Sequence, residues 1–292
     1  MKAYLSLFLA LILISCASDE KKFIVDEAYR SEFRTYKYEG NQNRINYLQL
    51  IGLFSLDSLD NTLGKASSNK LTLDIESLPD MIGTISVYQD SIIFSAHEGV
   101  SIKTSKDSLV DKLSLVLDEY GSSEKLFHER LNWQIITRAG KLYLRVWDTE
   151  NPMVEKFKGY QIYDLDPDYI VEGQFTYYET AKEEAVNSEL GVKTNTNFIG
   201  NINFKFKGNS HQLDVGRQGF TMVYDETSGD ETYGGGRYIY LDLPKTDSLI
   251  TLDFNRLYNP PCAFSKFTTC LYPPQQNQLP FKIEAGETLV LK

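Results

Sequence analysis

Residues 201–215 read NINFKFKGNSHQLDV, and this stretch indicates the fold class most directly. Apolar and polar side chains alternate over residues 202–206, which is the period of a β-strand with one buried face. Gly208-Asn209 then offers a tight turn, and the alternation resumes at residues 213–215. The stretch therefore predicts an antiparallel β-hairpin.

The same two-residue period recurs over much of the chain, in short runs that turn residues separate. It is found at residues 71–75, 85–87, 142–146, 239–243 and 250–254, and residues 92–94 and 220–224 are predicted as two further short strands. Short strands at this spacing are typical of β-sandwiches and β-barrels, so we predict an all-β, mainly antiparallel fold. Residues 106–130 fit either a strand pair or a short helix, and the polar residues 181–197 predict a loop.

A helix is predicted before the first strand. Apolar side chains recur at helical spacing between Val25 and Tyr36, and Gly40-Asn41 predicts the end of this helix. We therefore expect a signal peptide at residues 1–15, a tether with a short helix at 16–42, a β-sandwich module at 43–128, and a second β-sandwich or barrel module with a C-terminal proline-rich loop at 129–292.

Charge and composition exclude some classes of function. The chain has 292 residues, with 40 acidic and 30 basic side chains, for a formal net charge of -10. Because nucleic-acid binding depends on basic side chains that displace phosphate counterions, we expect no nucleic-acid partner. Three histidines leave little room for a histidine-rich metal centre, and we expect no metal and no cofactor.

The first sixteen residues predict the compartment. Lys2 precedes an almost wholly apolar run at residues 5–14, which is too short to span a bilayer and suits a signal peptide. The run ends in Leu-Ile-Ser-Cys at residues 13–16, which resembles the bacterial lipobox. That resemblance implies that Cys16 is lipidated and becomes the mature N-terminus. We expect an outer-membrane lipoprotein, held at the periplasmic face or cell surface by its lipid.

The predicted first module contains a segment with a second, looser resemblance. Residues 61–65 read Asn-Thr-Leu-Gly-Lys, and residues 68–73 read Ser-Asn-Lys-Leu-Thr-Leu. Their pattern of strand and turn residues resembles that of a forkhead-associated domain. Lys65 stands where that family uses an arginine, and residues 80–83 replace its serine and histidine pair. The resemblance implies a β-sandwich that lacks the family's phosphopeptide function.

The last third of the chain carries its most distinctive segments. These are Thr-Ser-Gly at residues 227–229, Thr-Tyr-Gly-Gly-Gly-Arg-Tyr at 232–238, Asp-Phe-Asn-Arg at 253–256, Asn-Pro-Pro-Cys-Ala at 259–263, and a second cysteine, Cys270, followed by prolines. At these segments the sequence resembles the domain of unknown function 1684 family. Gly235, Leu257 and Leu271 depart from the family's pattern without changing a polar group. The resemblance implies a bacterial protein of this architecture and supplies no activity.

Polar residues in these segments form the candidate ligand-binding site. The candidates are Glu231, Tyr233, Arg237, Asp253, Asn255 and Asn259. Arg237 can clamp a carboxylate or phosphate, or pair internally with Asp253 or Glu231. Asp253 and Asn255 lie on one side of a strand end, facing a pocket or capping loop backbone. Asn259 precedes a proline and is therefore held extended.

Two neighbouring features leave their alternatives open. Asp225, Glu226, Asp230 and Glu231 can bind Ca²⁺ or form a solvated hairpin loop. The three glycines at residues 234–236 let the backbone approach either a ligand or the proline-rich loop.

Cys262 and Cys270 remain once Cys16 is assigned to lipid. In an oxidising compartment these two cysteines predict one disulfide. For so short a loop, the lost chain entropy of the unfolded state corresponds to a stabilisation of about 2.6 kcal/mol. Free thiols, a metal site and simple packing in the core are the alternatives.

The leading functional hypothesis is non-enzymatic, with no catalytic residue assigned. It describes a membrane-anchored module that binds a small ligand, a glycan or a protein of the cell envelope. A second hypothesis is an envelope hydrolase that uses Asp253 and Glu231 near Arg237, or Asp148 with Asp253. A third is a purely structural envelope protein.

Overall fold

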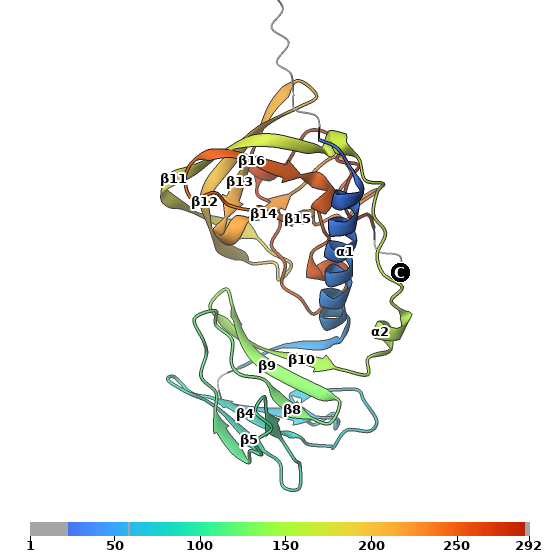
Figure 1. Ribbon diagram of the computed structural model, residues 1–292. Coiled ribbons are helices and arrows are strands. Elements are labelled where there is room, and N and C mark those ends of the chain that lie inside the picture. Colours follow the sequence, from blue (N-terminus) through green and yellow to red (C-terminus); the bar gives the residue numbers. More distant parts are fainter. Residues whose placement is uncertain (1–22, 58, 290–292) are drawn as a thin grey trace, which may run out of the picture.

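The computed structural model describes residues 23–57 and 59–289 and contains two β-rich modules joined by a long helix (Figure 1). The predicted all-β, mainly antiparallel class is confirmed, and the sheets of the described residues do not close into a barrel. The predicted signal peptide and Cys16 lie outside the described residues. Among the described residues, no helix combines the length and the apolar character that a bilayer span needs.

The first module is a sandwich of two five-stranded sheets. One sheet has the order β1 (Leu50–Ser55), β10 (Lys141–Asp148), β9 (Leu131–Arg138), β8 (Leu126–His128) and β6 (Lys103–Thr104), and the other has β3 (Leu71–Thr72), β2 (Leu59–Gly64), β4 (Gly83–Val87), β5 (Ile92–Ala96) and β7 (Lys112–Ser114). Leu63, Phe94, Trp133 and Leu144 belong to one buried core. The forkhead-associated resemblance stays a prediction.

The first module extends further along the chain than the sequence indicated. We expected it to end at residue 128, but β9 and β10 pair with β8 and β1 of the first sheet. The inward side chains of β9 and β10, such as Ile135 and Val146, belong to the core of the first module. Alternation identifies a strand but does not identify its hydrogen-bonding partner, and β1 lies far away in sequence. The undecided segment 106–130 forms the short strands β7 and β8.

The second module contains a four-stranded sheet and a separate hairpin. The sheet order is β13 (Asn209–Gly216), β12 (Lys193–Phe206), β11 (Ile170–Asn187) and β16 (Ser248–Asp253), and the hairpin joins β14 (Phe220–Val223) to β15 (Arg237–Tyr240). Five short 3₁₀ turns complete it: η1 (Pro167–Tyr169), η2 (Arg217–Gly219), η3 (Phe254–Arg256), η4 (Pro261–Ala263) and η5 (Gln275–Asn277). Phe175, Ile202 and Phe254 lie in its core.

The hairpin predicted at residues 201–215 is confirmed. Phe206 pairs with Asn209 across the turn. Lys207 and Gly208 both have positive φ, at 47° and 82°, which matches the twist that a two-residue hairpin requires.

The loop predicted at residues 181–197 is wrong. β11 and β12 continue through it as a ribbon, with pairs such as Glu183–Asn197 and Val186–Thr194. Most side chains of this ribbon are exposed, so its strands lack the apolar alternation that marks a half-buried sheet. Backbone pairing alone therefore extends the strands beyond the core.

Helix α1 (Glu27–Leu48) is longer than predicted because Gly40 does not end it. A Cβ atom at Gly40 would lie 2.8 Å from the Tyr160 hydroxyl oxygen, so the glycine permits close packing against Tyr160. One turn later, Arg44 is buried and forms a 2.8 Å ion pair with Glu287. Helix α1 is therefore packed into the second module and is not a free tether (Figure 1). A short helix, α2 (Pro152–Lys156), follows the first module.

Candidate functional site

Arg237 is a fully buried structural residue. Its Nη2 atom lies 2.8 Å from Asp225 Oδ2. The guanidinium also donates to the carbonyl oxygen of Ile283 through Nη2 and to that of Ala285 through Nη1. Internal pairing of Arg237 was one of the expected alternatives, and Arg237 does pair internally. The partners that we expected, Asp253 and Glu231, are wrong. Arg237 lies opposite Val223 in the β14–β15 hairpin, which brings the nearby Asp225 to the guanidinium. No ligand can reach this arginine without unfolding the C-terminal segment.

Asn255 and Asn259 brace irregular backbone. Asn255 Nδ2 donates to the carbonyl of Asp166 at 3.0 Å, and its Oδ1 accepts from the backbone N–H of the same residue. The Asn259 backbone N–H donates to Glu287 Oε2 at 2.7 Å, and its Nδ2 donates to the carbonyl of Thr288 at 2.7 Å. Both side chains are buried, as the backbone-capping alternative requires.

Among the described residues, Glu231 shares no hydrogen-bond partner with Asp253, and the glycine segment packs against the proline-rich loop. Glu231 accepts from the Tyr163 hydroxyl at 2.9 Å and from Lys282 Nζ at 2.6 Å. These two hydrogen bonds lower the pKa of Glu231 below its usual range, the Lys282 bond contributing most. A Cβ atom at Gly236, where φ is 80°, would lie 2.7 Å from Pro273 Cγ, so the glycines accommodate the proline-rich loop.

The acidic residues of the 225–231 loop do not gather around a common point. Asp225 is buried against Arg237, whereas Glu231 pairs with Lys282. Thr227 O accepts from the backbone N–H groups of the following turn, as in a hydrogen-bonded hairpin loop. Within the described residues, no three histidine, cysteine, aspartate or glutamate side chains come together as metal ligands do.

Of the six predicted site residues, Asp253 is the one that lines a cavity. The cavity has a volume of about 380 Å³ and lies between α1 and the strands β15 and β16. Tyr233 is only partly buried, and it packs beside Gly235 without reaching this cavity. The structure therefore separates Asp253 from Glu231 and Arg237, the partners that the hydrolase hypothesis needs.

A hydrogen-bond network holds the polar side of the cavity. Asp253 accepts from the Tyr29 hydroxyl at 2.8 Å and from Arg256 Nε at 3.2 Å. Arg256 Nη2 donates to Glu32 at 2.6 Å, and the Arg256 carbonyl accepts from the Tyr36 hydroxyl at 2.8 Å. Helix α1 and turn η3 are thus linked by side chains that also line the cavity.

The electrostatic surroundings keep the two tyrosine hydroxyls and Arg256 as hydrogen-bond donors. Burial and the Asp253 carboxylate raise the pKa of Tyr29, and burial raises the pKa of Tyr36, so both hydroxyls stay protonated. Burial acts to lower the pKa of Arg256, but Glu32 and Asp253 outweigh it and raise the pKa overall. With Asp242 also in the lining, three carboxylates face one guanidinium.

Tyrosine rings form another wall of the cavity. Tyr240 and Tyr258 are nearly parallel, at 9° between planes and 6.3 Å between ring centres. Tyr240 is 57% exposed at the rim, so a ligand can reach its face. Sequence reasoning missed this wall, although the aromatic stripe of Tyr29 and Tyr36 on the predicted helix indicated a face that needed a partner.

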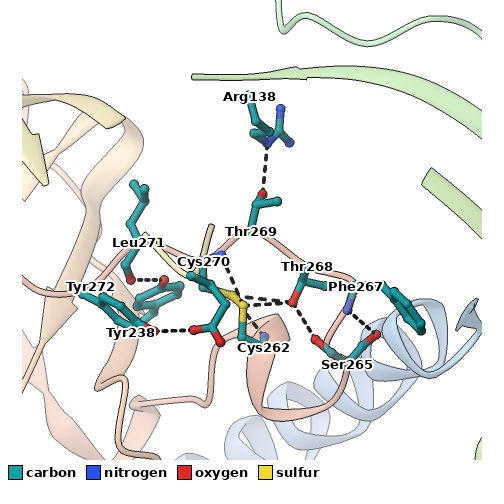
Figure 2. Close-up of a disulfide and its surroundings, with 11 residues drawn as sticks. Arg138, Tyr238, Cys262, Ser265, Phe267, Thr268, Thr269, Cys270, Leu271 and Tyr272 are labelled. Atoms are coloured by element: carbon teal, nitrogen blue, oxygen red, sulfur yellow. Dashed lines mark hydrogen bonds between the residues drawn. A yellow bond between two sulfur atoms is a disulfide. The ribbon is translucent and has the colours of Figure 1, made fainter. Parts of the chain in front are cut away.

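The predicted pairing of Cys262 with Cys270 is confirmed, and the bond closes a loop beside the end of the β11–β12 ribbon (Figure 2). Ser188 forms an isolated bridge with Leu271, and the Glu189 backbone N–H donates to the Cys270 carbonyl at 2.9 Å. The Tyr238 hydroxyl donates to the Leu271 carbonyl at 2.6 Å. The disulfide loop is therefore held by contacts with Ser188 and Glu189 at the ribbon tip and with Tyr238 on β15.

Comparison with known proteins identifies the second module. Residues 155–288 match the family described as protein of unknown function (DUF1684). The chain belongs to this family. The DUF1684 match contains all six predicted site residues but begins after the first module and α1. Since α1 lines the cavity, the cavity is built from the DUF1684 region together with a helix outside it.

One solved structure similar to this DUF1684 protein is the solution NMR structure of an uncharacterized protein from gene locus rrnAC0354 of Haloarcula marismortui. The two are 32% identical, the match covers 47% of this chain and 80% of that chain, and the TM-score is 0.39. No curated protein matches the chain.

Proposed function

We propose that this DUF1684 protein is a non-enzymatic, membrane-anchored binding module of the cell envelope, and that its ligand is a glycan bound in the cavity beneath α1. The observation that carries the proposal is the lining of that cavity. Fixed carboxylates and tyrosine hydroxyls lie there beside an accessible pair of tyrosine rings. Anchoring through Cys16 is the part of the proposal that rests on the sequence alone.

The chemistry of the lining suits a hydroxyl-rich ligand. Carboxylate oxygens accept hydrogen bonds from sugar hydroxyls, and the guanidinium of Arg256 can donate to them. The exposed face of Tyr240 offers a flat apolar surface for the C–H face of a pyranose ring. A volume of about 380 Å³ accommodates one or two sugar units.

The geometry favours binding over hydrolysis. Glycoside cleavage uses two carboxyl groups that flank the scissile bond, one of them free to give a proton. Asp253 instead accepts four hydrogen bonds, from Tyr29, Arg256 and two nitrogen atoms of Asn255. All four bonds come from the protein itself, so the carboxyl oxygens of Asp253 are already engaged in internal hydrogen bonds.

A titration tests the proposal. Neutral oligosaccharides of glucose and of N-acetylglucosamine are titrated into the purified protein by calorimetry. Tyr240→Ala is expected to weaken binding about five- to tenfold, the range for loss of one aromatic contact. Tyr120→Ala is the matched control, because Tyr120 is 74% exposed in the first module, far from the cavity.

Three results would count against the proposal. Absence of saturable binding by every oligosaccharide would favour the purely structural hypothesis, in which Asp253 only ties α1 to η3. Binding that Tyr240→Ala and Tyr120→Ala weaken equally would place the ligand elsewhere. Slow release of reducing sugar during the titration would instead favour the hydrolase.

A further inference from the structure

Three basic side chains gather on the outer face of the first sheet. Trp147 and Arg145 alternate with the core residues Leu144 and Val146 on β10, so they point away from the sandwich core. Lys125 Nζ lies 4.2 Å from the centre of the Trp147 ring, and Arg145 Cζ lies 6.0 Å from a ring centre of the same residue. Arg138 lies on the same face of the sheet, because Arg145 pairs with Gln134 and Arg138 follows Gln134 by four residues on β9.

This face is turned toward the second module. β9 and β10 lie, with β1, on the side of the first module that faces the second module (Figure 1). Arg138 Nε donates to Thr269 Oγ1 at 3.2 Å, within the disulfide loop of the second module (Figure 2). The basic cluster of Lys125, Arg138 and Arg145 therefore lies at the junction of the two modules.

None of these three cations forms an ion pair with a described residue. This distinguishes them from the buried or half-buried arginines Arg44, Arg130, Arg237 and Arg256, each of which has a carboxylate within 3.2 Å. The contrast is informative because the chain has ten more acidic than basic side chains, and its formal net charge is -10. Carboxylates are plentiful, yet none of those in the described residues pairs with these three cations.

Unused hydrogen-bond donors accompany the unpaired charges. Arg145 Nε and Trp147 Nε1 are both shielded, and no described residue accepts a hydrogen bond from either. Burial and the nearby Arg138 lower the pKa of Arg145 to about 10, and burial and Arg145 lower the pKa of Lys125. Burying these unpaired charges costs free energy. Contact with the Trp147 ring offsets only part of that free-energy cost, since one cation–π contact contributes about 0.5–2 kcal/mol.

We propose that the cluster of Lys125, Arg138 and Arg145 is an anion site that binds a phosphate group between the two modules. A phosphate brings up to two negative charges and several acceptor oxygens, which match the positive charge of the three side chains. A single carboxylate would leave more of this positive charge unbalanced. The phosphate can belong to a soluble monoester or to a lipid headgroup.

The experiment measures phosphate binding to the purified full chain by calorimetry and by thermal unfolding. The probes are inorganic phosphate, glycerol 3-phosphate and a water-soluble, short-chain phosphatidic acid, each compared with sodium chloride at equal ionic strength. We expect saturable binding and a rise in the unfolding temperature. The probe that binds tightest identifies the source of the phosphate.

Variants locate the site. Arg145→Gln is expected to weaken phosphate binding by about tenfold or more, as loss of a charge-assisted hydrogen bond does. Lys125→Gln is expected to weaken it in the same direction, and its side chain is only half-buried, so the fold should tolerate the change. Lys103→Gln is the matched control, because Lys103 lies in the same module and pairs with Asp107 at 2.8 Å.

The stability of the variants without phosphate provides a second readout. Removing an uncompensated cation should leave the unfolding temperature of Arg145→Gln unchanged or higher. Phosphate that acts no differently from chloride would overturn the proposal. So would binding that Lys103→Gln weakens as much as Arg145→Gln, or a clear loss of stability in phosphate-free Arg145→Gln.

Discussion

Two arginine side chains, Arg237 of β15 and Arg44 of α1, are buried in the interior of the second module. Arg237 is fully buried with Asp225, and Arg44 is buried with Glu287 beneath the rings of Tyr160 and other aromatic residues. Each guanidinium also joins segments that are distant in sequence. Because a buried ion pair contributes little net free energy but is costly to break, we interpret both as devices that specify one arrangement of the C-terminal segment.

Arg237→Met tests this interpretation. The substitution leaves Asp225 buried without its partner, so we expect the free energy of unfolding to fall by about 3–5 kcal/mol. Urea titration followed by circular dichroism, which reports on the strands of both modules, measures it. Arg34→Met is the control: its ion pair with Glu27 is exposed, and its loss should cost less than about 1 kcal/mol. Equal effects of the two substitutions would contradict the structural role of Arg237.

A pH dependence follows from Asp214. Burial acts to raise its pKa, but hydrogen bonds from Tyr178, Lys182 and Gln276 outweigh burial and lower the pKa below 3.8. A carboxyl group whose pKa is lower in the folded state stabilises the protein above its unfolded pKa. This stability is lost as the pH falls through the folded pKa.

We therefore expect the urea midpoint of the wild-type protein to fall between pH 5 and pH 3, and to fall less in Asp214→Asn. Asp90→Asn changes an exposed aspartate and should keep the wild-type slope. A slope that Asp214→Asn leaves unchanged would show that other carboxyl groups cause the acid sensitivity.

At the scale of elements, the β11–β12 ribbon and the disulfide loop support each other. The ribbon has too little apolar surface to be stable alone. Its tip is held by backbone hydrogen bonds from Glu189 to Cys270 and from Tyr272 to Asn187. The Tyr272 hydroxyl also donates to the Glu189 carboxylate.

The double variant Cys262→Ser, Cys270→Ser tests this coupling. Loss of the loop closure should lower the free energy of unfolding by about 2.6 kcal/mol. Hydrogen exchange of the ribbon amides should rise as well, because the loop that holds the ribbon tip loosens. The wild-type protein in reducing agent is the matched comparison. Unchanged exchange in the ribbon would show that it does not depend on the loop.

At the scale of the whole molecule, α1 connects the two modules and closes the cavity. Its buried residues include Phe33 and Leu48, and Tyr29 and Tyr36 reach into the second module. Because α1 also precedes β1 of the first module, any lipid attached near the N-terminus would be joined to the second module first. Phe23 and Ile24, the first described residues, line the cavity.

Cys16→Ser tests the proposed anchor. We expect the wild-type protein to partition with membranes and to incorporate a fatty-acid label, and the variant to lose both. Cys262→Ser should keep both, because that cysteine is bonded to Cys270. Membrane association that survives Cys16→Ser would contradict lipid anchoring.

Much of the fold was predictable from local patterns. The hairpin at residues 201–215 and the strand ending at Asp148 follow from alternation, which reports which side chains share one face of a strand. The ribbon at 181–197 escaped prediction because most of its side chains are exposed, and Val186 is its one buried apolar residue. The predicted site was less successful, since Arg237, Asn255 and Asn259 proved to be internal braces.

The sequence by itself determined the all-β class and the order of most strands, and it favoured a bond between Cys262 and Cys270 over the alternatives. Only the tertiary structure decided that those two cysteines are bonded, which sheet β9 and β10 join, that Arg237 pairs with Asp225, and that no described carboxylate pairs with the basic cluster. The reason is physical. Periodicity reflects the local geometry of the backbone, whereas burial and charge pairing depend on residues brought together from distant parts of the chain.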